Sequence, residues 1–194
     1  MILDSIFDHN IPAFRRIVNN NGHDYKINGT HLLFWVVQAR FTKGIKILVA
    51  SGVNVNIGGQ NGNTPLHIAV SQKYTAGVRA LIQGGANVNT TNNYKETPLH
   101  IACSFRYNKG TRLLVYAGAK VNIKDASEQT PLHRSSLVGF TYGVEMLLKR
   151  KAHTKVLDFR KRTPLMLACA VNAHHCTKHL LEHGTTMNLK EGMK

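Results

Sequence analysis

The feature that most constrains the fold of this chain is a recurring spacing of 33 residues between prolines. Four of the five prolines in the 194 residues follow one another at this interval, and each stands between a threonine and a leucine: Pro65, Pro98, Pro131 and Pro164. A histidine completes the tetrad in the first three copies, and a methionine replaces it in the fourth. Self-similarity at a fixed period of about 20–50 residues indicates a repeat architecture, in which each unit buries its apolar face against its neighbours.

One period already predicts its own local structure. Thr64 is a good helix cap and Pro65 suits the first helical position, so a short helix is expected to start there. A second helix is expected over 76–83, where apolar residues recur at helical spacing, and Gly84-Gly85 is expected to stop it. Asparagine and glycine fill the rest of the period at turn-forming positions. Each unit is therefore predicted to be an antiparallel helix pair followed by a projecting finger.

The pattern resembles the ankyrin repeat. The tetrads that begin at Thr64 and Thr97 continue with Ile-Ala, and T-P-L-H-x-A at a period of 33 is the signature of that family. A glycine followed by a Val-Asn pair ends the units, at 52–56, 85–89 and 118–122. The resemblance spans essentially the whole chain. It implies an all-α ankyrin repeat solenoid of helix-turn-helix pairs with projecting β-hairpin-like fingers.

The threonine positions predict a single ankyrin repeat domain over residues 1–194. Residues 1–26 are expected to form a partial N-terminal cap, and 188–194 to begin a further finger. The first full unit is degenerate, with His31-Leu32-Leu33-Phe34 in place of the tetrad. Five repeats are predicted, at about 27–59, 60–92, 93–125, 126–158 and 159–191.

The tetrad histidines invite a metal or catalytic interpretation, but their spacing favours a structural one. Repeats stack at about 8–10 Å, whereas zinc needs about 2 Å to each nitrogen, so His67, His100 and His133 cannot share an ion. We expect them to bridge the threonine hydroxyls and the finger backbone. Cys103 and Cys169 stand at the equivalent position of two repeats that are separated by a third. They are too far apart for a disulfide and are expected to be small core residues.

Glycine also recurs inside the second helix, where it lowers helix stability by about 1 kcal/mol relative to alanine. This pattern suggests close approach of helices at these positions. Lys151 stands where the helix-stopping glycine is expected, which predicts a distorted finger after it. The recurring glycines are Gly44, Gly77, Gly110 and Gly143.

Four histidines lie within residues 174–183. His175, His179 and His183 share a helical face and could seat a zinc or nickel ion, but a terminal repeat also needs a polar outer face, and we favour that reading. The chain has no nucleophile elbow, phosphate-binding loop or His-Glu-x-x-His motif. No catalytic, cofactor-binding or metal-ligating residue is predicted, and the protein is not expected to be an enzyme.

Charge and composition narrow the class of partner and the location. The 25 Lys and Arg residues outnumber the ten Asp and Glu, a net charge of +15, so an anionic partner is favoured. Residues 149–151 and 160–162 are basic triplets, which resemble a bipartite nuclear signal but also suit a solvated finger. Three cysteines are too few for a disulfide framework, and no apolar run is long enough to span a bilayer. We expect an intracellular protein, in the cytoplasm or the nucleus.

The resemblance implies that partners bind at the finger tips and at the exposed concave face of the first helices. Apolar side chains there, rimmed by arginines, suit a partner with apolar and acidic groups, although burial within the solenoid is the alternative. The expected function is a non-enzymatic protein–protein interaction module or adaptor. The alternative is a binder of nucleic acid or an anionic surface. The candidate partner-binding residues are Tyr94, Phe105, Leu137, Val138, Phe159, Arg160, Arg162 and Val171.

Overall fold

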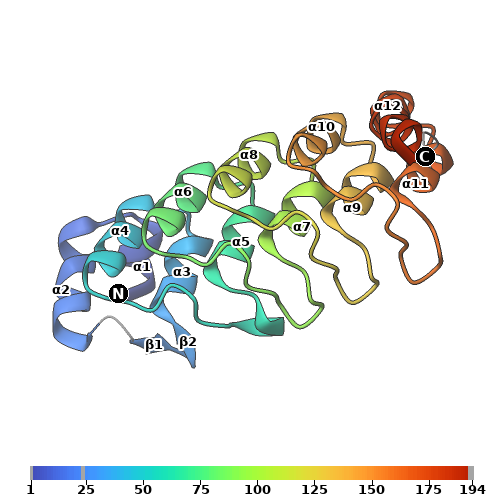
Figure 1. Cartoon of the computed structure of the whole chain (residues 1–194). Helices are drawn as coiled ribbons and strands as arrows, with labels where there is room; N and C mark the ends of the chain where they lie inside the picture. Colours follow the sequence, from blue (N-terminus) through green and yellow to red (C-terminus); the bar gives the residue numbers. More distant parts are fainter. Residues whose placement is uncertain (1, 23–24, 192–194) are drawn as a thin grey trace. The chain divides into compact units, whose positions relative to one another are not determined.

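The computed structural model describes residues 2–22 and 25–191 and divides the chain into two compact units. We call Met1–Asn93 unit 1 and Tyr94–Lys194 unit 2, and each is described by itself. The described residues contain twelve α-helices, one short 3-10 helix and a two-stranded hairpin (Figure 1). The prediction of an all-α repeat fold built from helix pairs and projecting fingers is confirmed.

In unit 1, α1 packs on α2, α3 on α4 and α5 on α6. The first helices of these pairs contact one another in the order α1, α3, α5, and the second helices in the order α2, α4, α6. The loops that follow the helix pairs project beyond the helices as fingers (Figure 1). The elements are α1 (Ile2–Phe7), α2 (Ile11–Asn21), β1 (Lys26–Ile27), β2 (Thr30–His31), α3 (Leu32–Gln38), α4 (Thr42–Ala50), η1 (Gln60–Gly62), α5 (Pro65–Ser71) and α6 (Thr75–Gln83).

Unit 2 repeats the same arrangement three times. The first helices contact one another in the order α7, α9, α11, and the second helices in the order α8, α10, α12. Neighbouring fingers are joined by backbone hydrogen bonds from Ala126 N to Tyr94 O (2.9 Å) and from Phe159 N to Ser127 O (3.2 Å). The helices are α7 (Pro98–Ser104), α8 (Asn108–Tyr116), α9 (Pro131–Leu137), α10 (Thr141–Lys149), α11 (Pro164–Ala170) and α12 (His174–Glu191).

The N-terminal segment is more complete than a partial cap, because α1 and α2 form a full helix pair. Asn10 caps α2 by accepting a hydrogen bond from the Ala13 amide at 3.1 Å, and Pro12 lies in the first turn. Phe14 and Val18 bury the inner face of the helix. The Asn10-Ile11-Pro12 segment is a helix-start signal of the same kind as Thr-Pro, and it could have been recognised in the sequence.

The first repeat replaces the missing Thr-Pro start with a true β-hairpin. Lys26 pairs with His31 and Ile27 with Thr30. Asn28 and Gly29, the two residues between the strands, have φ angles of 50° and 76°. Positive φ at both positions is the geometry of the two-residue hairpin turn that Asn-Gly favours. The chain therefore enters α3 from a strand.

The tetrad histidines have the structural role that the sequence predicts. His100 Nδ1 accepts a hydrogen bond from the Thr97 amide at 3.1 Å and lies 2.8 Å from its hydroxyl. Because Nδ1 is an acceptor, Nε2 carries the proton and donates it to the Gln129 carbonyl at 3.1 Å, in the next finger. His133 repeats this geometry with Thr130 and the Arg162 carbonyl. Burial lowers the pKa of both His100 and His133, although the backbone carbonyls act in the opposite direction.

The recurring glycines have a different main cause from the close helix approach that we expected. A Cβ at Gly143 would collide with the ring of Phe140, the residue that precedes α10, and would lie 2.8 Å from Ser135 Oγ. Each of the other three glycines likewise lies under an aromatic ring three residues earlier, from Phe41, Tyr74 or Tyr107. An aromatic side chain of the same repeat occupies most of the space, and close approach of the first helix adds to it at Gly44, through Val36 Cγ1 at 2.8 Å, and at Gly143.

Two expectations at the ends of the second helices were wrong. Lys151 takes a φ of 60°, and the Ala152 amide still reaches the Leu147 carbonyl at 3.0 Å, so the finger that follows is not distorted. Its backbone closes between Asp158 N and Arg162 O at 3.0 Å. Residues 188–191 belong to α12 and do not begin a finger, whereas 192–194 lie outside the described residues. A lysine can adopt the left-handed conformation at modest cost when the rest of the turn is hydrogen-bonded.

The two cysteines that share a slot differ in environment, so one expectation needs correction. Cys103 is buried, and burial raises the pKa of its thiol to about 12. Cys169 is exposed and is not a core residue. Cys103 lies on α7, which α9 covers, whereas Cys169 lies on α11, the last of the first helices.

Candidate partner-binding surface

All eight residues that the sequence selects for partner binding lie in unit 2, but the structure divides them. Tyr94, Phe159 and Arg160 stand at the finger tips. Phe105, Leu137, Val138 and Val171 stand at the other end of the first helices, where each chain segment turns towards its second helix. Each first helix has seven residues, so about 10 Å of helix separates the two groups. Arg162 belongs to neither group.

The finger tips present exposed aromatic rings beside a cation. Tyr94 and Phe159 each expose 54% of their surface. The Arg160 guanidinium carbon lies 5.2 Å from the centre of the Phe159 ring, a cation–π arrangement. The Arg160 amide also donates to Asp158 Oδ1 at 2.9 Å, which holds the tip in shape.

Arg162 stabilises the finger and is not freely available to a partner. Its Nε and Nη2 atoms donate to Asp158 Oδ2 at 3.0 and 2.8 Å, and the Asp158 side chain is fully buried. Burial alone would raise the pKa of Asp158, but hydrogen bonds from the Arg162 backbone and guanidinium, Gln129 and the Arg160 amide hold it at about 2. A partner that binds Arg162 must compete with this buried carboxylate.

Three of the four residues at the helix turns, Leu137, Val138 and Val171, line an open groove, which we call the turn groove, whereas Phe105 does not line it. It has a volume of about 440 Å³. Leu137 is 37% exposed and Val171 is 43% exposed, so these side chains are not buried in the solenoid, and Val138 is half-buried. Three basic or titratable side chains, Arg106, His174 and His175, lie at its polar edge. The lining residues are Arg106, Leu137, Val138, Gly139, Thr141, Val171, Asn172, Ala173, His174 and His175.

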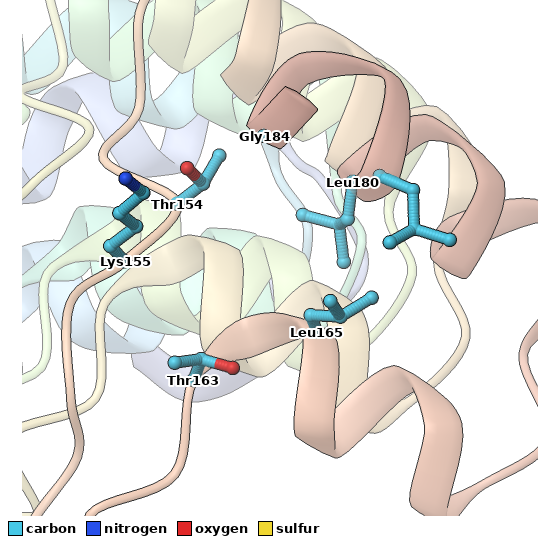
Figure 2. A pocket seen from close by; sticks show the side chains of 7 residues that line it. Thr154, Lys155, Thr163, Leu165, Leu180 and Gly184 are labelled. Atoms are coloured by element: carbon cyan, nitrogen blue, oxygen red, sulfur yellow. The ribbon is translucent and has the colours of Figure 1, made fainter. Parts of the chain in front are cut away.

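A second hollow lies on the last helix pair, where Leu165 and Leu180 face Thr154 and Lys155 (Figure 2). Thr163, Leu181 and Gly184 complete its lining. Its volume is about 210 Å³. Leu181 is 47% exposed, and the neighbouring Met166 is 56% exposed. Both occupy positions that a following repeat buries elsewhere in unit 2, so this hollow is the uncovered stacking face of the last repeat.

The histidine cluster on α12 is engaged with neighbouring protein groups. His179 Nε2 lies 3.1 Å from Glu145 Oε1 on α10, and His183 Nδ1 lies 2.9 Å from the His179 carbonyl. Within residues 2–22 and 25–191, no three His, Cys, Asp or Glu side chains are grouped so as to hold a metal ion. The contacts of His179 and His183 are of the kind that a polar outer face makes.

One exposed aromatic residue that the sequence reading did not select lies beside the basic triplet at 149–151. Tyr116 is 69% exposed, and the guanidinium carbons of Arg150 and Arg112 lie 5.2 and 5.8 Å from its ring centre. The spacing of Arg112 and Tyr116 by one helical turn was a signal for half of this contact. The approach of Arg150, which follows the last residue of α10, could only be seen in the structure.

Comparison with known families matches the ankyrin repeat model (three copies) at residues 4–92, 33–125, 78–158 and 111–191. The chain belongs to the ankyrin repeat family. Ankyrin repeats are protein–protein interaction modules, and the proteins that contain them are typically not enzymes. A search of curated protein sequences found no significant match. In the part of the chain that the structure describes, no helix is both long and apolar enough to cross a membrane.

Proposed function

We propose that this chain is a non-enzymatic interaction module or adaptor whose turn groove binds a protein segment with apolar and acidic side chains. The observation that carries this proposal is the convergence of Leu137, Val138 and Val171 with Arg106 in one open groove. Exposed apolar side chains next to a cation are typical of the anchor positions in protein interfaces. The proposal treats residues 1–194 as one ankyrin repeat domain, in which the helix pair α1–α2 within 1–26 caps the five repeats that follow.

The groove can recognise two features of a partner at once. An aliphatic side chain of the partner would remove Leu137 and Val171 from water, at about 25 cal/mol for each Å² of apolar surface buried. A carboxylate of the partner would pair with Arg106, and the His174 and His175 side chains line the same groove. The finger tips, with Tyr94, Phe159 and Arg160, lie about one helix length away and provide a second contact for a longer partner.

An intracellular location, in the cytoplasm or the nucleus, is part of this proposal. The three cysteines, Cys103, Cys169 and Cys176, are all free thiols. Free thiols are typical of proteins that work in a reducing compartment.

The test is affinity capture with a matched pair of variants. We expect Leu137→Ser combined with Val171→Ser to weaken capture of a partner about tenfold or more, because both apolar anchors are lost. Leu157→Ser is the control, since Leu157 is a similarly exposed leucine of unit 2 (41%) outside the groove. Equal capture by the double variant and the control would exclude the turn groove as the binding site.

A second candidate function is binding of nucleic acid, and Tyr116 is the observation that favours it. A tyrosine between two arginines beside Lys149 and Lys151 combines a stacking surface with a cluster of positive charge. If this face binds a labelled single-stranded oligonucleotide, log affinity should fall linearly with log salt. Arg150→Ala with Lys151→Ala should flatten that slope by about one for each lost phosphate contact, whereas Lys178→Ala on α12 should not.

A further inference from the structure

A groove in unit 1 has the features of a second docking surface, separate from the turn groove. It lies between α2 and α4, two neighbouring second helices that pack on each other, and it has a volume of about 310 Å³. We call it the outer groove. Its lining residues are Ile11, Arg15, Lys43, Lys46, Ile47 and Ala50.

The composition of the outer groove is unusual, because its lining is half cationic and half aliphatic. Arg15 lies one helical turn after Ile11 on α2, and on α4 the remaining lining residues fall on one face at spacings of three and four. The three cations are exposed at its rim, Ile11 and Ile47 are half-buried at its floor, and Ala50 is exposed.

The cations of the outer groove have no anionic partner within the described residues. Arg15, Lys43 and Lys46 take part in none of the ion pairs found among the described side chains, whereas Glu96, Asp125, Glu128, Glu145, Asp158 and Glu182 of unit 2 all do. Residues 25–95 contain no Asp or Glu. Three cations held close together without a counter-charge repel one another, and a partner that brings carboxylates relieves this repulsion.

We propose that the outer groove docks an amphipathic helix of a partner protein that carries acidic side chains on both flanks of an apolar stripe. The groove follows two helices of 11 and nine residues, about 16 and 13 Å long, so a docked helix would contact it over two to three turns. A row of leucines fits between the ridges of α2 and α4, and glutamates at spacings of three or four reach Arg15 on one side and Lys43 and Lys46 on the other.

The chemistry of the groove favours this occupant over three others. The floor is aliphatic and offers no aromatic ring for a nucleic-acid base to stack on. The apolar residues are recessed between helices, whereas a lipid surface is entered by protruding side chains. The groove is open and its polar groups are long, flexible cations, whereas small-molecule sites enclose most of the ligand and fix it with precisely placed donors. This inference does not rest on the turn groove, which lies in the other unit.

The experiment uses the full chain and a fluorescein-labelled helical peptide with leucines at spacings of three and four and glutamates on both flanks. Two control peptides carry glutamine for glutamate, or serine for leucine, with everything else unchanged. Binding is measured by fluorescence anisotropy at 0.15 M salt, where the Debye length of about 8 Å limits the influence of distant charges. The protein variants are Lys43→Glu with Lys46→Glu, Ile47→Ala, and the control Lys26→Glu with Lys73→Glu, which changes the net charge of unit 1 equally.

We expect the glutamate–leucine peptide to bind, and each control peptide to bind about tenfold more weakly. Lys43→Glu with Lys46→Glu should weaken binding about tenfold or more, Ile47→Ala about threefold, and Lys26→Glu with Lys73→Glu less than twofold. Amide chemical shifts in the labelled protein should change at 11–19 and 42–50. Circular dichroism of every variant checks that the helices are intact.

Several outcomes would overturn the proposal. Equal loss in both charge-reversed variants would show non-specific attraction, and no binding of the peptide at millimolar concentration would exclude a helix of this kind. Binding of a single-stranded oligonucleotide or phosphatidylserine vesicles that depends on Lys43 and Lys46, without peptide binding, would assign the groove to that ligand. The Leu137→Ser and Val171→Ser variant should bind the peptide normally, so failure of the turn-groove proposal would be seen separately.

Discussion

Two repeats of unit 2 start with the same residues and differ in what covers them. The inner repeat, 126–158, begins with Thr130-Pro131-Leu132, and the last repeat, 159–191, with Thr163-Pro164-Leu165. Leu132 is completely buried, whereas Leu165 is only half-buried. Leu148 exposes 6% of its surface, and its equivalent Leu181 exposes 47%. In this fold, the exposed fraction of a side chain therefore depends on whether another repeat packs against it as much as on the residue type.

The same pair of repeats shows that residue type alone does not end a second helix. Lys151 and Gly184 occupy equivalent positions. The lysine takes the left-handed conformation and α10 ends before it, whereas α12 continues through the glycine to Glu191. The amide of Ala152 is bonded back to Leu147, and the finger after it is closed by Asp158 and joined to the preceding finger. This local hydrogen bond and the contacts of the finger that follows, and not a glycine, accompany the end of α10.

The largest expected effect is the difference between two equivalent leucines. Leu132→Ala should destabilise the chain by about 2–5 kcal/mol, because it leaves a cavity in a filled core. Leu165→Ala should cost clearly less, about 1 kcal/mol, because that side chain already contacts solvent. Urea unfolding followed by circular dichroism measures both. Equal destabilisation would show that the end of unit 2 is covered in solution.

A double-mutant cycle tests why glycine is present in one repeat and absent from the other. Gly143→Ala should destabilise by about 1–3 kcal/mol, because its Cβ would collide with the Phe140 ring. In a Phe140→Ala background the same change should destabilise clearly less, because the ring is gone and only Ser135 Oγ, 2.8 Å away, still opposes the new Cβ. The last repeat has the matching pair Ala173 and Cys176. If the two substitutions were additive, the ring would not be the reason for the glycine.

Acid should lower the stability of the inner repeat, 126–158, more than that of the last repeat, 159–191. Burial lowers the pKa of His133 in the folded chain, so below the unfolded value of about 6.5 the unfolded state binds more protons. The stability from a neutral His133 is present above pH 6.5 and is lost as pH falls towards the folded pKa, by up to about 1.4 kcal/mol per pH unit. Met166 occupies this position in the last repeat and does not titrate.

Hydrogen exchange, corrected for intrinsic rates, measures this difference between pH 7 and 5.5. Protection over 131–148 should fall more than protection over 164–180. In the last repeat, the tetrad position holds Met166, so no buried histidine is available there to take up a proton. A uniform loss of protection across both repeats would contradict the assignment to the buried tetrad histidine.

The smallest expected effect concerns the left-handed lysine. Lys151→Gly should stabilise the chain by at most about 1 kcal/mol, because glycine adopts a φ of 60° without a Cβ clash. Gly118→Ala, at the equivalent position of the preceding repeat with a φ of 88°, is the reverse change and should destabilise. Thermal unfolding compares the two. A destabilised Lys151→Gly variant would indicate that the lysine side chain makes a stabilising contact.

The sequence pattern predicted some features of the candidate partner-binding surface and missed others. Position within a repeat correctly predicted that Tyr94, Phe105, Leu137, Phe159 and Val171 are exposed. It did not show that they form two groups, at opposite ends of the first helices. It also treated Arg162 as equivalent to Arg160, although buried Asp158 holds the guanidinium of Arg162. The outer groove went unnoticed, because it joins residues from α2 and α4 that are about 30 positions apart.

The sequence by itself determined the repeat, its period and its local structure. These follow from short-range chemistry: a threonine cap, a proline in the first turn and a histidine that binds the cap three residues away. Only the tertiary structure decided which equivalent residues are buried, where helices end and which side chains meet in grooves. Burial and ion pairing depend on side chains from an adjacent repeat. The 33-residue pattern does not indicate which of these side chains contact a given position. Cys103 and Cys169 make the point, since the same residue in the same slot is buried under α9 in one repeat and faces solvent in the other.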